Sequence, residues 1–209
     1  MERALSAAGK LFLSGEYAVL WGGTARIACV GPRTFAHVKR RDDREVRILL
    51  TEGAVHAMTT PLGANWSGEV PPEFSFVART IDLALRAHGK EALGFDLALS
   101  PSPVGEGGRK LGMGSSARAV VLTAEACRFI LEDRYDALKL SLAAHALAQG
   151  GKGSGGDVAA SFAGGIVRYR RFDLARIAAS AESGPFLASL IQSPPVDVWK
   201  LPPRPLQLS

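Results

Sequence analysis

The chain has 209 residues, 47% of them hydrophobic, which is enough for one substantial core and argues against two complete domains. Its formal charge of +5 favours an anionic partner, but the basic residues are scattered and not interleaved with aromatic platforms, so nucleic acid is a minor alternative to a phosphorylated metabolite. No apolar stretch reaches the roughly 18 residues of a membrane span, and no signal-like block follows the amino terminus, so we expect a cytoplasmic protein without a membrane partner.

The amino-terminal part of the chain is predicted to form a β-rich layer. Short segments rich in apolar and β-branched residues are separated by turn signals and lie at residues 10–14, 25–30, 34–40 and 46–50. Cys29 lies in this layer and Cys127 is far from it, so neither a disulfide framework nor a zinc site is indicated. We expect both cysteines to be buried as small apolar residues.

A helix and a strand follow. Apolar residues recur at helical spacing over residues 73–88, after a Pro-Pro pair, and Gly89 supplies a natural stop. Residues 95–99 alternate between apolar and smaller or polar side chains, which predicts a strand with one buried face. That strand leads into a Gly-rich stretch over residues 101–114, which we expect to be a loop feeding a helix.

The second half of the chain repeats the pattern of helix and Gly-rich loop. Helices are predicted over residues 115–131 and 137–149, and a second Gly-rich loop covers residues 150–156 and leads into another helix. Residues 165–171 then read as a strand, followed by a helical tail and a Pro-rich end.

The first Gly-rich loop is the most informative element. Residues 112–117 read G-M-G-S-S-A and open a helix, so the backbone can approach a ligand closely and the helix start presents unpaired N–H groups that suit a phosphate. The pattern is neither a Walker A loop nor a nucleophile elbow. A tight turn before a helix is the structural alternative, and taken alone the two interpretations are about even.

Two further segments carry charges that the surroundings do not explain. Lys10 opens an otherwise apolar strand and Glu16 lies in the turn after it, while Asp157 follows the second Gly-rich loop. A charge in an apolar setting is costly unless paired. The structural alternatives are a solvated strand end for Lys10, a turn residue for Glu16 and a helix cap for Asp157.

Together, these three segments resemble the GHMP small-molecule kinases. The family's P-G-K-x-x-L-x-G-E-[HY]-[AS]-V motif is similar to residues 8–19, and its G-L-G-S-S-A phosphate loop is similar to residues 112–117. Within that class, the residues around Glu16, the lysine two positions before the glycine loop and the stretch 148–172 look most like phosphomevalonate kinases. The resemblance implies an α+β fold similar to ribosomal protein S5 domain 2, and ATP-dependent phosphorylation of 5-phosphomevalonate with Mg²⁺.

The resemblance also implies residue roles. The ATP-binding group would come from one run of the chain and consist of Lys110, Gly112, Gly114, Ser115, Ser116 and Ala117. The acceptor-binding group would come from the other two segments and consist of Lys10, Glu16, Tyr17, Ser154, Gly155 and Asp157. Lys10 and Asp157 would be the catalytic pair, and Ser116 would help to hold Mg²⁺.

Some positions depart from the family pattern. Ala8 replaces the proline of the first motif, Met113 replaces the loop leucine, and Arg118 occupies a position that is usually small. Ala146 lies near the place where mevalonate kinases have a metal-binding Glu, which leaves the metal ligands beyond Ser116 open. We leave the helical His145 out of the expected site, because a lone helical histidine is more often a packing or surface residue.

The class completes its site with a carboxy-terminal domain bearing a third Gly-rich motif. We therefore expect residues 1–209 to be an amino-terminal ATP-binding domain on which such a domain packs, and to be inactive alone. The nearest alternative activity is that of a mevalonate kinase or another GHMP metabolite kinase. A module that binds ATP without catalysis, and an RNA-binding domain, are alternatives of other classes.

Overall fold

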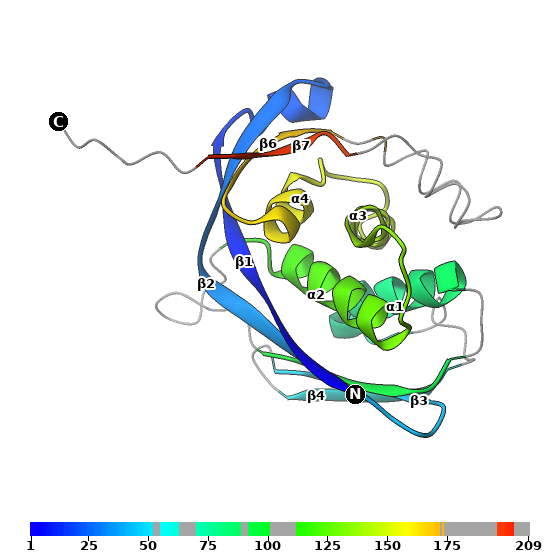
Figure 1. Ribbon diagram of the computed structural model, residues 1–209. Helices are drawn as coiled ribbons and strands as arrows, with labels where there is room; N and C mark the ends of the chain where they lie inside the picture. Colours follow the sequence, from blue (N-terminus) through cyan, green and yellow to red (C-terminus); the bar gives the residue numbers. More distant parts are fainter. Residues whose placement is uncertain are drawn as a thin grey trace.

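The computed structural model is a curved sheet wrapped around four α-helices (Figure 1). It describes residues 1–51, 55–62, 70–88, 92–100, 112–171, 173 and 196–202. The strands are β1 (Glu2–Ser14), β2 (Thr24–Arg40), β3 (Glu45–Leu50), β4 (His56–Pro61), β5 (Phe95–Leu99), β6 (Ile166–Arg170) and β7 (Val198–Leu201). The helices are η1 (Ala18–Trp21), η2 (Pro72–Phe74), α1 (Ser75–His88), α2 (Ser115–Ile130), α3 (Ala137–Ala148) and α4 (Gly156–Ala163), where η marks a 3₁₀ helix.

Strand β2 organises the sheet, because it is long enough to pair with different strands at its two ends. Its first residues pair with β6 and its last with β5, and β1 pairs along most of its length. The order is β4-β3-β5-β2-β6-β7 with β1 off this path, and β3 with β5 is the parallel pair. Strand β1 therefore lies along β2 and also contacts helices α2 and α4 (Figure 1).

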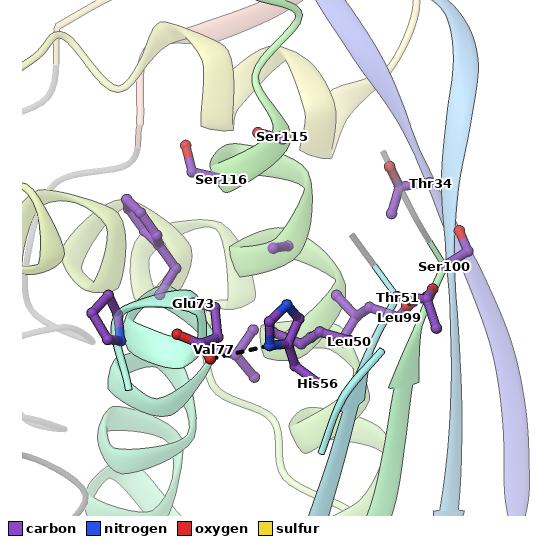
Figure 2. A pocket seen from close by; sticks show the side chains of 13 residues that line it. Thr34, Leu50, Thr51, His56, Glu73, Val77, Leu99, Ser100, Ser115 and Ser116 are labelled. Atoms are coloured by element: carbon purple, nitrogen blue, oxygen red, sulfur yellow. Dashed lines mark hydrogen bonds and ion pairs between the residues drawn. The ribbon is translucent and has the colours of Figure 1, made fainter. Parts of the chain in front are cut away.

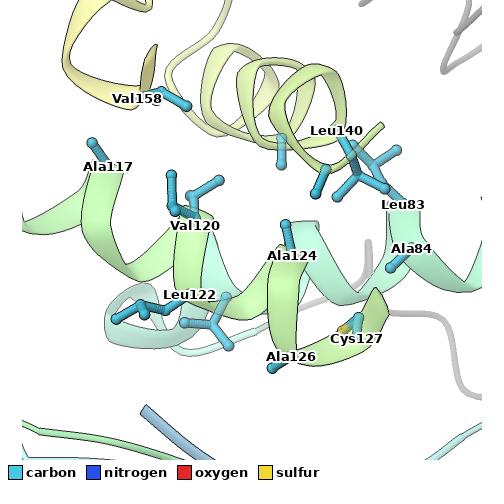
Figure 3. Packing of buried hydrophobic residues seen from close by; sticks show 14 of the residues in the cluster. Leu83, Ala84, Ala117, Val120, Leu122, Ala124, Ala126, Cys127, Leu140 and Val158 are labelled. Carbon is cyan, nitrogen blue, oxygen red and sulfur yellow. The ribbon is translucent and has the colours of Figure 1, made fainter. Parts of the chain in front are cut away.

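Helix α2 lies at the centre of the core and contacts α1, α3 and α4 as well as β1 and β2. Its inward residues are small or β-branched, as at Val120 and Ala124, so the neighbouring helices approach closely (Figure 3). Leu140 of α3 is fully buried against this helix cluster, and truncating such a leucine costs about 2–5 kcal/mol. Burial also raises the pKa of the Cys127 thiol to about 12. This packing fixes the position of the start of α2 relative to helices α3 and α4.

Most predicted elements are confirmed, and the differences lie in the strands. Strand β1 begins at Glu2 rather than near residue 10, because its first half has few large apolar residues and is held by pairing with β2. The predicted strands at 25–30 and 34–40 are one strand: the partners in β2 jump from Arg33 to Val30 between Ala8 and Gly9, which absorbs the Gly-Pro pair as an irregularity.

The remaining expectations concern two strands, the cysteines and the fold as a whole. Strands β4 and β7 were not predicted; β7 is a short edge strand, which carries a weak sequence signal. Cys127 is buried as expected, but Cys29 is only half-buried and donates its S–H to the Ala160 carbonyl at 2.9 Å. The predicted helical tail and the loop at 101–111 lie outside the described residues. None of the described helices is long and apolar enough to cross a membrane. The expected mixed α and β fold is confirmed.

Candidate active site

The three segments singled out in the sequence meet at Gly114. The Lys10 N–H donates to the Met113 carbonyl at 3.2 Å, which ties β1 to the turn before α2. A β-carbon built on Gly114 would lie 3.4 Å from Lys10 Cγ and 3.7 Å from Asp157 Cβ. The side chains of Lys10 and Asp157 therefore both start beside Gly114. The two residues are 147 positions apart in the chain, the difference between 157 and 10.

The first glycine turn, residues 112–114, prepares the start of α2 for an anion. Gly112 and Gly114 both have positive φ, 66° and 77°, a backbone region that favours glycine. Gly114 is the N-cap residue and supplies no side-chain cap. The first helical bond runs from the Arg118 N–H to the Gly114 carbonyl at 3.1 Å, so the preceding three amides point out of the helix end. Such an end attracts phosphate through its N–H groups and its dipole.

The second glycine turn, residues 150–156, holds the start of α4 in a similar way. Gly155 is an N-cap with φ 76°, again without a side-chain cap. Ser154 Oγ accepts from the Gly156 N–H at 3.2 Å, and the buried Tyr169 hydroxyl donates to the Ser154 carbonyl at 2.7 Å. A β-carbon on Gly156 would lie 2.8 Å from Ile27, so only glycine lets the turn lie this close to the sheet. Asp157 is thereby fixed in the first turn of α4.

Lys10 and Asp157 are half-buried and lie in a mixed polar and apolar setting. Lys10 Nζ lies 5.1 Å from the centre of the Phe12 ring, which is within range for a cation–π contact. Asp157 Oδ1 accepts from the Val158 N–H at 2.9 Å, which fixes one carboxylate oxygen and leaves the other directed away from that amide. A lysine and a carboxylate beside a helix start form a site that can hold an anion and orient a second group next to it.

His145, which was not expected in the site, contacts both glycine-turn helices. Its Nε2 lies 3.1 Å from Ser116 Oγ and 3.9 Å from Asp157 Oδ2. The side chain is buried, and its ring packs on Phe76 with centroids 5.4 Å apart. Burial lowers the pKa of His145, while the Asp157 carboxylate acts in the opposite direction, so the neutral ring is favoured at neutral pH. The sequence of α3 gave no indication that His145 belongs to the site, because its contacts with Ser116 and Asp157 come from packing between helices.

A cavity of about 250 Å³ opens beside the start of α2 (Figure 2). Ser115 and Ser116 line its edge, and apolar walls come from several elements, among them Leu50 of β3 and Val77 of α1. His56 Nδ1 lies 3.1 Å from Glu73 Oε1 across the mouth of the cavity. Hydroxyl groups line the sheet side and belong to Thr34, Thr51 and Ser100. The sequence predicted none of these lining residues apart from the two serines, because the cavity is built by segments distant in the chain.

The remaining predicted residues divide into three groups. Ala117 is buried in the first turn of α2 next to Gly114, whose added β-carbon would lie 3.7 Å from Ala117 Cβ. Glu16 and Tyr17 lie in the turn after β1 and are exposed, and among the described residues no hydrogen bond or ion pair joins them to Lys10 or Asp157. Lys110 lies outside the described residues. The substrate-binding role of Glu16 and Tyr17 stays a prediction.

Arg118, which departs from the family pattern, is buried at 2% exposure in α2. A β-carbon on Gly9 would lie 2.8 Å from its Nη1 and 3.1 Å from Met113 Cβ. The glycine of the first motif therefore makes room for a guanidinium behind the first glycine turn.

Comparison with known proteins explains this arrangement. Residues 75–165 match the family model for the GHMP kinases N terminal domain. Mevalonate kinase from Pyrococcus furiosus is 28% identical over 181 residues, which cover 82% of this chain and 52% of that protein. The chain spans about half the length of the curated relatives that it matches.

Solved structures agree with the family. Streptococcus pneumoniae phosphomevalonate kinase, in complex with phosphomevalonate and AMPPNP, is similar with a TM-score of 0.77 and 29% identity, covering 95% of this chain and 58% of that chain. The Lin0012 protein from Listeria innocua has a TM-score of 0.83 and 24% identity, covering 97% and 58%, and shares the fold. The resemblance to GHMP kinases in the sequence is thus confirmed, and the chain has mevalonate-pathway kinases among its relatives.

The residues around the first glycine turn have the chemistry to hold a magnesium nucleotide. Ser116 Oγ and the Asp157 carboxylate are hard oxygen donors of the type that Mg²⁺ prefers. Within the described ranges, no group of three or more His, Cys, Asp or Glu side chains could hold a metal by itself. A magnesium ion here would therefore take most of its ligands from phosphate oxygens and water, which is how Mg²⁺ is commonly bound beside phosphates.

Proposed function

We propose that this chain is the ATP-binding and acceptor-binding part of a kinase that converts 5-phosphomevalonate to 5-diphosphomevalonate. The observation that carries the proposal is that Lys10 and Asp157 both lie next to Gly114, at a helix start suited to phosphate. Phosphoryl transfer depends mainly on positioned reactants and neutralised charge, and these residues can supply both.

Each group has a distinct task in the proposed reaction. The outward amides at the start of α2 hold nucleotide phosphate oxygens, and Lys10 neutralises charge between the two reactants. Asp157 orients the attacking oxygen of the acceptor. Bound MgATP supplies the phosphoryl group: a bond forms from the acceptor oxygen to the γ-phosphorus, the bond from that phosphorus to the β–γ bridging oxygen breaks, and ADP leaves with the electron pair. Ser116 is positioned to contribute one oxygen to the metal or to a phosphate.

The cavity beside Ser115 and Ser116 suits the nucleoside of ATP. It adjoins the phosphate-binding helix start, has apolar walls for the flat face of a base and has hydroxyl groups for polar edges. The paired His56 and Glu73 supply a hydrogen-bonding edge at its mouth. This location places the base on the α1 and β3 side of α2, away from the second glycine turn.

The nature of the acceptor decides what Asp157 must do. The terminal phosphate of phosphomevalonate, with a second pKa of about 6, is mostly ionised at neutral pH, so its oxygen needs orientation and charge neutralisation rather than a base. The hydroxyl of mevalonate would carry a proton for Asp157 to accept. Similarity to the pneumococcal phosphomevalonate kinase, at 29% identity, supports phosphomevalonate as the acceptor. Similarity to the Pyrococcus mevalonate kinase, at 28% identity, keeps mevalonate as the alternative acceptor.

Coupled ADP-release assays on the full-length protein with each acceptor test the proposal. We expect a higher kcat/KM with phosphomevalonate than with mevalonate. A clear preference for mevalonate would replace the proposal with the alternative, and ATP binding without turnover on either acceptor would indicate a non-catalytic module.

We further propose that residues 1–209 need a second domain for turnover. Two observations support this: the chain spans about half the length of its curated relatives, and the sheet face opposite the helices exposes large apolar side chains. Leu11 is 55% exposed and Trp199 is 60% exposed. Large apolar side chains exposed on one face of a sheet favour an interface there. We expect residues 1–209 alone to be poorly soluble and to turn over little; robust kinase activity would contradict this.

The cytoplasmic location also stays a prediction.

A further inference from the structure

His145 occupies a position between the two helices that carry the proposed chemistry. It lies near the end of α3, and its side chain is only 4% exposed. One nitrogen, Nε2, lies 3.1 Å from the Ser116 hydroxyl of α2 and 3.9 Å from the Asp157 carboxylate of α4. The ring is held from the other side by Phe76 of α1. The neutral ring thus has one hydrogen bond, to Ser116, and a longer electrostatic contact with Asp157.

The two neighbours together select which ring nitrogen carries the proton. A lone pair on Nε2 would face the Asp157 carboxylate, which is electrostatically unfavourable. An N–H at Nε2 faces that carboxylate favourably and donates to Ser116 Oγ at hydrogen-bond distance. Because Ser116 Oγ then accepts from the ring, its own O–H is free to turn outward, toward the helix start.

We propose that His145 is a positioning residue that links the first and second glycine turns through an Nε2–H that donates to Ser116 and faces the Asp157 carboxylate. This inference rests on the proposed kinase function and deepens it. The histidine fixes the Ser116 rotamer on the nucleotide side and the separation of Ser116 from Asp157 on the acceptor side. A change of about 1 Å in such a separation can cost about a hundredfold in rate. His145 itself does not touch the reacting atoms.

Three substitutions at this position separate the hydrogen bond from the packing. In the full-length protein, His145→Phe keeps a ring on Phe76 but removes the donor. His145→Gln places an amide N–H near the position of Nε2, whereas His145→Asn is too short and mimics Nδ1. We expect kcat to fall about tenfold to a hundredfold in the Phe and Asn variants, with the KM for ATP within about threefold of wild type and Tm little changed. We expect His145→Gln to recover much of the lost kcat.

A cycle of variants tests whether His145 acts through Ser116. The loss in the His145→Phe, Ser116→Ala double variant should be smaller than the product of the two single losses, because the first substitution already removes the link. The double variant His145→Phe, Tyr135→Phe is the control. Because the two sites are distant, its loss in kcat should equal the product of the two single losses. Equal kcat losses in the Gln and Phe variants, or wild-type kcat in the Phe variant, would overturn the proposal.

The ¹⁵N spectrum of the imidazole supplies a readout that does not need turnover. The chain has four histidines, and the His145 signals are assigned from their loss in His145→Phe. We expect the Nε2–H tautomer in the wild-type protein and a shift toward Nδ1–H in Asp157→Asn or Ser116→Ala. An Nδ1–H tautomer in the wild-type protein would disprove the link. If neither acceptor is phosphorylated, the kinase proposal fails, and this spectrum still decides the role of His145.

Discussion

The two glycine turns end in the same kind of N-cap residue but have opposite electrostatics. In each, a glycine with φ of 77° or 76° is the N-cap of the following helix and gives no side-chain cap. The first turn of α2 carries no acidic residue and lies beside Lys10, whereas the first turn of α4 carries Asp157. The start of α2 is therefore suited to bind an anion, whereas the start of α4 carries a negative charge of its own, on Asp157.

The difference shows how a single local design can serve two sides of a reaction. Glycine and the uncapped helix start bring backbone close to a ligand in both places, but the side chain one or two positions later decides which ligand is held. On the proposed function, the first glycine turn holds the nucleotide and the second orients the acceptor. Substitutions in each turn should then affect different kinetic constants.

The largest effect is expected at the charge that distinguishes the turns. Asp157→Asn keeps the size of the side chain and removes its negative charge, so we expect kcat to fall by about 10²- to 10⁴-fold while the Kd for ATP stays within a few-fold. Steady-state kinetics and calorimetric titration of the full-length protein measure the two quantities.

Asp136→Asn is the matched control for this change. Asp136 is also at a helix start, where its side chain accepts from the Lys139 N–H at 3.1 Å, and asparagine caps about as well. We expect wild-type kinetics from the control. Unchanged turnover in Asp157→Asn would remove the carboxylate from the mechanism and make the two turns equivalent.

The next effect compares the two N-cap glycines directly. Gly114→Ala and Gly155→Ala each force a side chain into the left-handed region, at a cost of about 1–2 kcal/mol, so both should lower the free energy of unfolding similarly. Only Gly114→Ala disturbs the amides proposed to hold phosphate, and we expect it to weaken ATP binding about tenfold or more. Denaturant unfolding and ATP titration separate the two; equal losses of ATP affinity would show that the turns do not divide the ligands.

The sequence predicted these turns well, because their signals are local. Glycine is needed where φ is positive, and helix starts follow directly from the pattern around residues 112–117 and 153–157. The proximity of Lys10 and Asp157 at Gly114 was inferred only through a resemblance to a family. Nothing in their spacing along the chain would place them together, since β1 and α4 are far apart in the sequence and contact each other only in the folded chain.

The parts that the sequence missed depend on packing between distant segments. His145 reaches Ser116 because α3 packs on α2, and the helical pattern of α3 gives no indication of which buried side chain meets a polar partner. The cavity has walls from β2, β3, α1 and the residues after β5, so its lining cannot be read from any one of them. Strand β4 was also missed, and it contributes His56 to that cavity.

A smaller effect is expected from the support of the second glycine turn. Tyr169→Phe removes the hydrogen bond to the Ser154 carbonyl and should cost about 0.5–1.5 kcal/mol of unfolding free energy. Tyr135→Phe removes a similar buried bond, to the Ala124 carbonyl at 2.8 Å, far from the site. We expect both variants to lose similar stability by urea unfolding, and only Tyr169→Phe to raise the KM for the acceptor. A raised KM for ATP in Tyr169→Phe would contradict the division of roles.

The smallest effect is expected at Ser154, whose hydroxyl accepts from the Gly156 N–H within the turn itself. Ser154→Ala removes this acceptor, but the half-exposed position lets water replace it, so the stability loss should be near the lower end of about 0.5–1.5 kcal/mol. Ser154→Thr keeps the hydroxyl and is the matched control. Because the bond fixes the residue just before Asp157, we expect Ser154→Ala to raise the KM for the acceptor about twofold and leave ATP binding unchanged. If ATP affinity fell while the acceptor KM stayed constant, the second turn would have to serve the nucleotide, and the contrast between the turns would be reversed.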